Sequence, residues 1–322
     1  MSTYKQLTYE QRCQIEALNK SGMSQQEIAD IVETSQSTIS RELRRNKGQR
    51  GYRHKQAQSM ADERRLNAAK ALKMDESMTE RVEDKLREKW SPEQISGWLL
   101  EELGEHLSHE RIYQHVWDDK WAGGALYTHL RRQGKRYLKR GNGKPSRGHI
   151  RNRVGIEERP DIVDEKSRIG DWEIDTVIGK SHSGALVTIV ERVTQFTLVA
   201  NVPDKSAEAV TAATIALLKP YKGVLHTITA DNGKEFAYHE QLTAKLGAAV
   251  YFARPYHSWE RGLNENTNGL LRQYWPKSTD FKQVTGDEVL AVVTQLNQRP
   301  RKTLGFKTPH ALMQNHLAAQ AA

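Results

Sequence analysis

The spacing of hydrophobic residues changes near residue 168 of this 322-residue chain. Before that point, apolar residues recur at helical spacing and the clearest boundaries are helix caps. After it, residues 171–179, 185–192 and 195–202 are runs rich in Val, Ile and Thr, separated by turn residues, which predicts three successive strands. The pattern therefore predicts a helical first half followed by an α/β second half.

Residues 7–46 are predicted to form three short helices. Two of the helix starts are capping boxes, Thr8-Tyr-Glu-Gln11 and Ser24-Gln-Gln-Glu27, in which a hydroxyl and an amide or carboxylate each accept from a free backbone N–H group. The second and third helices form a helix-turn-helix, whose last helix presents its N-terminal residues to base edges in the major groove. The expected DNA contacts are Gln36, Ser37, Thr38, Ser40, Arg41, Arg44 and Arg45.

The charge distribution favours DNA binding over the alternative of an ordinary three-helix bundle. Seven basic residues occur from Arg41 to Lys55, against the single acid Glu42. Residues 1–154 contain 30 Lys or Arg and 21 Asp or Glu, whereas residues 155–322 contain 19 of each, so the net charge of +9 belongs to the first half. A basic half beside a neutral half is typical of a nucleic-acid-binding module joined to a domain with another task.

A second helical unit is predicted over residues 90–130. It begins at the cap Ser91-Pro-Glu-Gln94, breaks at Gly104 and continues as a helix over 108–117, in the manner of a helix-turn-helix with a longer turn. The residues that such a motif would expose are His109, Arg111, Gln114 and His115. Between the two units, residues 56–89 alternate acids and bases on a helical period, which predicts one solvated connecting helix.

From Arg131 to Arg153 the chain contains 10 Lys or Arg, no acid, and several Gly and Pro, so this stretch has no means of forming a core. We expect a flexible tether that contacts phosphates, and a passive linker is the alternative. Its candidate DNA contacts are Arg131, Arg132, Arg136 and Arg140.

The second half continues with a helix over 206–219, a strand over 224–230, a helix over 236–246, a strand over 248–252 and a long helix over 258–274. The order βββαβαβα is that of a ribonuclease-H-like domain with a mixed sheet. The predicted architecture is therefore multidomain: a helix-turn-helix domain (1–50), a helical connector (51–89), a second helix-turn-helix-like domain (90–130), a basic linker (131–154) and an α/β ribonuclease-H-like catalytic core with C-terminal helices (155–322).

Three carboxylates should converge in that core. Asp175 lies on the first strand, Asp231 ends the adjacent fourth strand, and Glu265, separated from Asp231 by 33 residues, projects from the helix across that end. Each acid alone has an ordinary structural explanation, but together they match the hard oxygen ligands that Mg²⁺ or Mn²⁺ prefers. Two such ions can stabilise both the attacking and the leaving oxygen of a phosphoryl transfer, so we expect phosphodiester cleavage and strand transfer.

Other chemistries are disfavoured. Cys13 is the only cysteine, which excludes an internal disulfide and a thiolate zinc site, and a metal site built from His106, His109 and His115 would have no thiolate. No apolar stretch is long enough to cross a membrane and no signal-peptide pattern is present, so we expect a soluble cytoplasmic protein.

Five motifs carry a resemblance to a known family: Gly170-Asp-Trp-Glu-Ile-Asp175, Thr229-Ala-Asp-Asn-Gly-Lys-Glu-Phe236, Pro255-Tyr-His-Ser-Trp-Glu-Arg-Gly262, Asn264-Glu-Asn-Thr-Asn-Gly-Leu-Leu-Arg-Gln-Tyr274 and Arg299-Pro-Arg-Lys-Thr-Leu-Gly305. With them, the chain resembles the acidic-triad transposases of the IS-thirty family of bacterial insertion sequences. Two positions depart from the family pattern, since Ile174 stands where Gly is frequent and Glu260 stands where Gln is expected.

The resemblance implies a Mg²⁺-dependent recombinase that binds the inverted-repeat ends of its element, cuts 3′ ends and joins them to target DNA. It also implies that Asp175, Asp231 and Glu265 are the catalytic metal ligands and that Arg272 grips the substrate backbone. Because two ends must be held together, we expect at least a dimer, acting at the nucleoid. A DNA-binding regulator with an inactive core and a ribonuclease for RNA–DNA hybrids are the competing hypotheses.

Arg41 provides a test of the predicted recognition helix. Arg41→Ala should weaken binding to the element's ends by roughly 1–3 kcal/mol and reduce sequence preference, because an Arg that reads a guanine makes two hydrogen bonds to it. Titration of end DNA and unrelated DNA separates the outcomes. An equal loss on all sequences would make Arg41 a phosphate contact instead.

Overall fold

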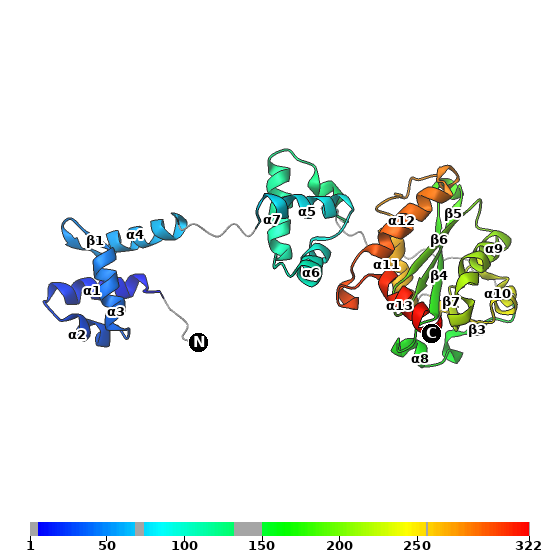
Figure 1. The fold of residues 1–322 in the computed structure, drawn as a ribbon, viewed down its shortest axis with the longest axis horizontal. Helices are drawn as coiled ribbons and strands as arrows, with labels where there is room; N and C mark the ends of the chain where they lie inside the picture. Colours follow the sequence, from blue (N-terminus) through cyan, green and yellow to red (C-terminus); the bar gives the residue numbers. More distant parts are fainter. Residues whose placement is uncertain (1–5, 68–73, 132–149, 256, 322) are drawn as a thin grey trace. The chain divides into compact units, whose positions relative to one another are not determined.

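The computed structural model describes residues 6–67, 74–131, 150–255 and 257–321. The chain divides into two compact units, Met1–Lys73 and Met74–Ala322 (Figure 1). No helix among these described residues is both long enough and apolar enough to cross a membrane.

The first unit contains α1 (Tyr9–Lys20), α2 (Gln25–Ile31), α3 (Gln36–Arg45), the short hairpin β1 (Lys47–Gly48) and β2 (Gly51–Tyr52), and α4 (His54–Asn67). Both capping boxes predicted here are present, at Thr8 and Ser24. The helices pack through fully buried Ile15, Ile28 and Ile39, and Ala57 of α4 joins the same core.

A buried ion pair fixes α3 within this unit. The Arg12 Nε lies 2.9 Å from a Glu42 carboxylate oxygen, and the Tyr52 hydroxyl donates to the same oxygen at 2.9 Å. A buried carboxylate needs such partners because its desolvation is otherwise uncompensated. The pair ties α3 to both α1 and the hairpin, so the helix expected to read DNA is held from two sides.

The second unit begins with a helical part made of α5 (Glu76–Arg87), α6 (Pro92–Leu103) and α7 (His109–Trp121). The predicted single connecting helix over 56–89 is wrong. Helix α5 is separate from α4 and buries Met78, Val82 and Leu86 against α6 and α7. These three residues are four apart and form an apolar stripe, which the alternating charges around them concealed.

The rest of the second unit is built on a six-stranded sheet: β3 (Val154–Gly155), β4 (Asp171–Ile178), β5 (Ala185–Glu191), β6 (Thr197–Val202), β7 (Thr227–Ala230) and β8 (Ala249–Phe252). The strand order is β3-β8-β7-β4-β5-β6, with β4, β5 and β6 antiparallel and β4, β7, β8 and β3 parallel. This mixed sheet confirms the predicted ribonuclease-H-like fold.

Helices cover both faces of the sheet (Figure 1). One face carries α9 (Ala207–Leu218) and α10 (His239–Leu246), and the other carries α11 (Gly262–Leu271) and α12 (Gly286–Gln298). Helix α13 (Pro309–Ala321) adds Met313 to the first core, and α8 (Ile162–Glu165) is a single short turn before β4. Because side chains alternate along a strand, Trp172 and Ile174 pack in the first core, while Glu173, Asp175 and Val177 face α11.

Two predicted boundaries shift. The long helix over 258–274 divides into a 3₁₀ turn, Ser258–Arg261, followed by α11, which ends at Leu271. The stretch expected to be linker up to residue 154 already contributes to the sheet, since Ile150 is buried in the first core and Val154 begins β3.

Candidate active site and DNA-facing residues

Asp175 lies on β4, opposite Thr188 of β5, on the face that α11 covers. Its Oδ1 accepts from the backbone N–H of Thr176 at 2.8 Å, and its Oδ2 accepts from the Asn268 side-chain amide at 3.0 Å. The amide oxygen of Asn268 in turn accepts from the Thr188 hydroxyl at 2.9 Å. This chain of bonds from β5 through α11 fixes the orientation of the carboxylate.

Asp231 directly follows β7, the parallel neighbour of β4, so the sheet brings it beside Asp175, as the strand order predicts. Its Oδ1 accepts from the backbone N–H of Gly233 at 2.7 Å, which is the local bond of an Asp-Asn-Gly turn. Its Oδ2 remains directed toward Asp175, because both carboxylates contact one guanidinium.

That guanidinium belongs to Arg261, at the end of the 3₁₀ turn before α11. Its two terminal nitrogens lie 3.3 Å from Asp175 Oδ2 and 3.4 Å from Asp231 Oδ2. The arginine side chain is only 10% exposed. Burial raises the pKa of Asp175, Arg261 opposes that rise, and the neighbouring charge of Asp231 adds to it. Arg261 is therefore the cation that compensates two carboxylates held side by side.

Glu265 does not join the two aspartates in this arrangement. It is exposed on α11, and the described residues contain no group of three or more His, Cys, Asp or Glu able to hold a metal ion. Nevertheless, Glu265 is four residues after Arg261 and three before Asn268, both of which touch Asp175, so helical spacing puts all three on one side of the chain. The aspartate oxygens are a donor set that suits Mg²⁺ or Mn²⁺, whereas Arg261 now takes the position between them.

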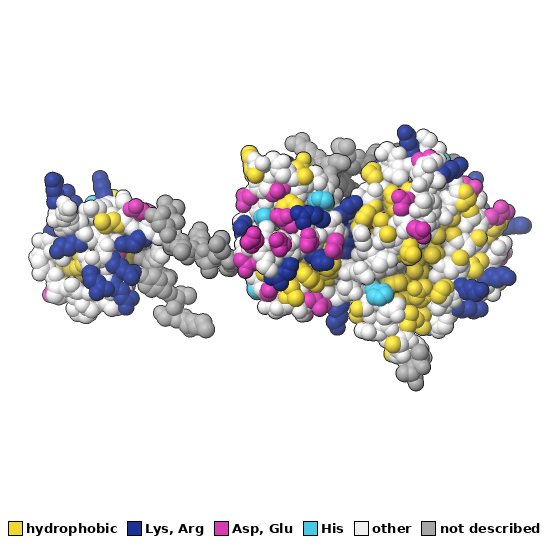
Figure 2. All heavy atoms as spheres, turned by 45° about the horizontal axis from the view of Figure 1, so that its top comes forward, with side chains coloured by type: hydrophobic (Ala, Val, Ile, Leu, Met, Phe, Trp, Pro, Cys, Tyr) yellow, Lys and Arg dark blue, Asp and Glu magenta, His cyan; other side chains and the backbone are white. Residues whose placement is uncertain are grey.

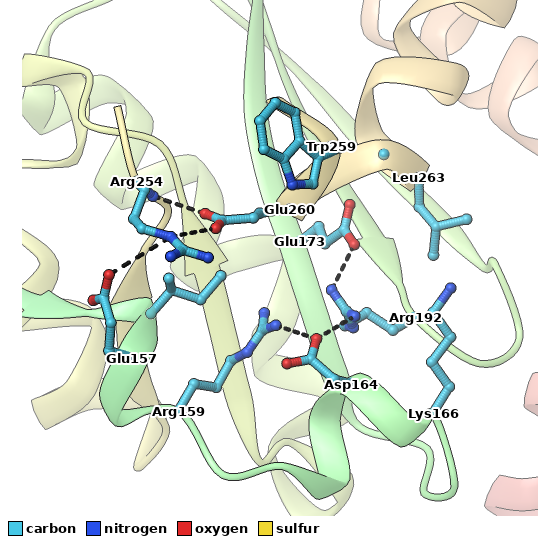
Figure 3. A pocket seen from close by; sticks show the side chains of 12 residues that line it. Glu157, Arg159, Asp164, Lys166, Glu173, Arg192, Arg254, Trp259, Glu260 and Leu263 are labelled. Carbon is cyan, nitrogen blue, oxygen red and sulfur yellow. Dashed lines mark hydrogen bonds and ion pairs between the residues drawn. The ribbon is translucent and has the colours of Figure 1, made fainter. Parts of the chain in front are cut away.

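Glu260 is turned away from this cluster. Its carboxylate accepts from Arg254, at 2.7 Å from Nε and 2.8 Å from the backbone N–H, and it lines a separate cavity of about 410 Å³ (Figure 3). The same cavity shows Glu173 paired with Arg192 at 2.8 Å. Glu260 is thus the partner of an arginine and lies outside the aspartate site.

Glu173 anchors the start of α11. It is 2% exposed, and its second oxygen accepts from the backbone N–H of Asn264 at 3.1 Å. Burial raises the pKa of Glu173, and Arg192 opposes the rise. Asn264 immediately precedes Glu265. The bond to Glu173 therefore fixes the backbone from which the Glu265 side chain extends.

Sequence reasoning assigned no role to Arg261, Asn268, Thr188 or Glu235. Glu235 is buried beside the site, where it pairs with Lys205 at 2.6 Å and accepts from the Thr176 hydroxyl at 3.0 Å. Helical spacing was a signal for Asn268, because positions 264, 265 and 268 share one side of α11, whereas Arg261 ends the 3₁₀ turn before that helix. Arg261 and Asn268 both contact Asp175, and they lie four residues before and three residues after Glu265.

The predicted recognition helix presents most of its candidate residues to solvent. Gln36, Ser37, Arg41, Arg44 and Arg45 are exposed, and Thr38 and Ser40 are half-buried. Figure 2 shows Lys and Arg side chains spread over the visible face of this unit, whereas acidic and basic side chains mix on the helical part of the second unit. The basic residues of α3 are thus accessible on the surface of this unit.

The other candidate DNA contacts differ in exposure. Gln114 and His109 are exposed and Arg111 is half-buried, but His115, expected on the surface, lies 3.0 Å from Glu83 of α5. Arg131 donates to Asn266 of α11 at 2.9 Å. The candidate contacts Arg132, Arg136 and Arg140 lie outside the described residues.

Arg272 is partly buried. It donates to the Ile178 carbonyl at 2.9 Å, at the end of β4, and burial lowers its pKa. In this arrangement its guanidinium holds the sheet to α11, and a DNA phosphate would have to compete with that carbonyl.

Comparison with known proteins bears on these residues. Residues 3–46 match the family described as a helix-turn-helix domain, and residues 166–258 match the integrase core domain. The chain is 46% identical over 308 residues to the transposase for insertion sequence element IS4351 of Bacteroides fragilis, covering 95% of this chain and 94% of that one. It is 38% identical over 326 residues to the transposase InsI for element IS30A of Escherichia coli K12, covering 97% and 84%. The chain belongs to the IS30 family of insertion-sequence transposases.

A third transposase is also similar to this chain. The transposase for element IS1086 of Cupriavidus metallidurans is 35% identical over 327 residues, covering 98% of this chain and 96% of that one. The family resemblance seen in the motifs is thus confirmed over nearly the whole chain. The integrase core match includes Asp175 and Asp231 and ends before Glu265.

Arg261→Gln tests whether this arginine substitutes for a metal ion. Without divalent metal, the variant should lose stability on the order of 2 kcal/mol, because two carboxylates would repel without a cation; their partial exposure limits the loss. Added Mg²⁺ should raise the melting temperature more than in the wild type, since no guanidinium has to be displaced. Thermal unfolding with and without MgCl₂ measures both effects.

Arg254→Gln is the matched control, because it removes a neighbouring cation that pairs with Glu260 instead of the aspartates. Its response to Mg²⁺ should equal that of the wild type. Equal Mg²⁺ responses in all three proteins would show that Arg261 does not compete with the ion.

Proposed function

We propose that this transposase binds the inverted-repeat ends of its own insertion sequence and catalyses metal-dependent 3′-end cleavage followed by strand transfer into target DNA. The observation that carries the proposal is the convergence of Asp175 and Asp231 from adjacent parallel strands onto one cation position. A pair of fixed carboxylates at the end of such strands is the arrangement expected of a site for hard divalent cations.

In this proposal Asp175, Asp231 and Glu265 hold Mg²⁺ or Mn²⁺, with two ions as the expected number. When bound, the ions would activate water or a 3′ hydroxyl and stabilise the leaving oxygen. Arg261 must leave the space between the aspartates, and Glu265 must approach them. Asn268 would keep Asp175 oriented during that change, because its amide bonds to both the carboxylate and Thr188.

The helix-turn-helix of residues 3–46 supports a division of labour between recognition and chemistry. The exposed residues of α3 would read the element's ends, and Arg272 would contact the substrate backbone after releasing the Ile178 carbonyl. Because two ends must be joined, we expect a homodimer or a larger assembly. Its substrate is chromosomal DNA, so we expect the protein to act in the bacterial cytoplasm at the nucleoid.

Two other functions would leave some of these structural features unexplained. A DNA-binding regulator with an inactive core would not need Asp175 held by three separate contacts beside Asp231. A ribonuclease for RNA–DNA hybrids would not need a helix-turn-helix domain. An assay for 3′-end cleavage and strand transfer with Mg²⁺ on end DNA distinguishes all three.

Asp231→Asn should abolish cleavage and strand transfer while end binding stays within about twofold of the wild type, because the acid would hold metal while recognition belongs to the helical half. Gel-shift titration and the cleavage assay, run on the same preparation, measure the two properties. Loss of end binding in a folded Asp231→Asn protein would contradict this division.

A pair of substitutions tests whether Glu265 or Glu260 is the third metal ligand. Glu265→Gln should reduce strand transfer by at least about 100-fold, because an amide is a weak substitute for a carboxylate ligand. Glu260→Gln should keep most of the activity, since its carboxylate pairs with Arg254 on the far side of the 3₁₀ turn. Strand-transfer rates under Mg²⁺ settle the ranking, and the reverse order would show that the third ligand is misplaced.

A further inference from the structure

The motif Arg299-Pro-Arg-Lys-Thr-Leu-Gly305 has no part in the aspartate site. Within the second unit it borders a cavity of about 680 Å³ that lies between the helical part and α11. Basic side chains line this cavity from both sides: Lys89 and Arg131 from the helical part, and Arg299, Arg301 and Lys302 from the motif.

Lys89, Arg299 and Arg301 form no ion pair with any residue that the structure describes. Lys302 pairs with Glu93 at 2.6 Å, and Glu93 also lines the cavity. Lys89 Nζ instead donates to the Gln273 carbonyl at 3.1 Å and lies 3.9 Å from the centre of the Tyr274 ring. Arg301 donates to the Leu296 carbonyl at 3.0 Å. Neutral acceptors thus take the place that carboxylates usually fill.

Arg299 is the deepest member of the group. It is 1% exposed, and it donates to the Glu88 carbonyl at 3.2 Å and to the Tyr274 hydroxyl. The Nε atoms of Arg299 and Arg301 are buried without a protein partner. A buried donor without an acceptor is unfavourable, so this group of cations is incompletely satisfied by the protein alone.

The charges also repel one another. Burial lowers the pKa of Arg301 to about 10, and Arg299 and Arg131 contribute to the fall. Burial lowers the pKa of Lys89 as well, with a further contribution from Arg299. A cluster that served packing alone would gain by including an acid, as the pairs Arg192–Glu173 and Arg12–Glu42 do elsewhere in this chain. Among the described lining residues, Glu93 is one acid against five cations, and this excess of positive charge favours an anionic ligand.

We propose that this cavity binds the phosphodiester backbone of the element's end DNA, with Arg301 and Lys89 as the phosphate contacts and Arg299 as the residue that positions them. The inference rests on the proposed function and names where the second unit holds its substrate. Helix α11 forms one wall through Asn266, Leu270 and Gln273, and Asn266 directly follows Glu265. At 1.5 Å per residue, the cavity lies within roughly 12 Å of Glu265 along the chain, so a strand cut at the carboxylates would extend into it.

Arg301→Gln in the full-length protein tests the contact, without divalent metal so that no DNA is cut. Binding of a duplex carrying the element's end should weaken about fivefold, and the slope of log K against log salt should fall by about 0.9, the value for one lost phosphate contact. Lys245→Gln is the matched control, because it removes one exposed cation from α10, outside the cavity. The control should leave both quantities unchanged.

A duplex of unrelated sequence and equal length identifies the source of the phosphate. A loss confined to the unrelated duplex would overturn the assignment to end DNA. Affinity and salt slope equal to those of Lys245→Gln would overturn the site itself. Thermal unfolding checks that the variant is folded. Arg301→Gln should melt close to the control, because the variant loses both a repelled charge and the hydrogen bond to the Leu296 carbonyl.

Lys89 gives a readout that needs no variant. Its lowered pKa should make its amine react faster with acetic anhydride near pH 8 than an ordinary lysine, and end DNA should protect it. Peptide mass spectrometry of the wild type measures the protection, and an unprotected Lys89 in a saturated complex would overturn the proposal. A protein that binds and is protected, yet fails to cut with Mg²⁺, would instead contradict only the proposed function.

Discussion

The catalytic half depends on the repulsion between Asp175 and Asp231. Adjacent parallel strands deliver both carboxylates to the same end of the sheet. A cation between them therefore stabilises the fold. Arg261 supplies that cation from within the chain, and it does so from the turn that leads into the helix carrying Glu265. The same electrostatic requirement thus links the stability of the sheet to the position of the third acid.

Two polar contacts hold helix α11 against the sheet. Glu173 binds the backbone at Asn264 and Asn268 binds Asp175, so α11 is attached to β4 at two points one turn apart. Between them, the Asn264 side chain is fully buried, and neither its oxygen nor its nitrogen has a protein partner. A buried amide in this condition favours a change of conformation that would satisfy it. Such a change at the start of α11 would also alter the position of Glu265, the next residue.

The features that the sequence predicted correctly are those formed by residues close together in the chain. Capping boxes at Thr8, Ser24 and Ser91 involve residues three apart, and all three are present. The order of elements was predictable because three successive Val- and Ile-rich runs are followed by runs that alternate with helical segments, and the sheet layout of that order brings Asp175 beside Asp231. The stripe of α5 was missed because its apolar residues are separated by charged ones. Arg261 was missed for another reason: which cation compensates a carboxylate pair depends on tertiary contacts that spacing does not encode.

The first strand of the sheet also ties the chain's path to its chemistry. Strand β3 is only two residues long, yet it pairs with β8, and the preceding Arg153 donates to the side chain of Asn232, the neighbour of Asp231. Asn232 in turn donates to the Ala253 carbonyl just after β8. The catalytic domain is thus entered beside its own acidic loop. The chain that enters the sheet is therefore bonded directly to the residue next to Asp231, so a shift of residues 153–155 would be transmitted to that turn.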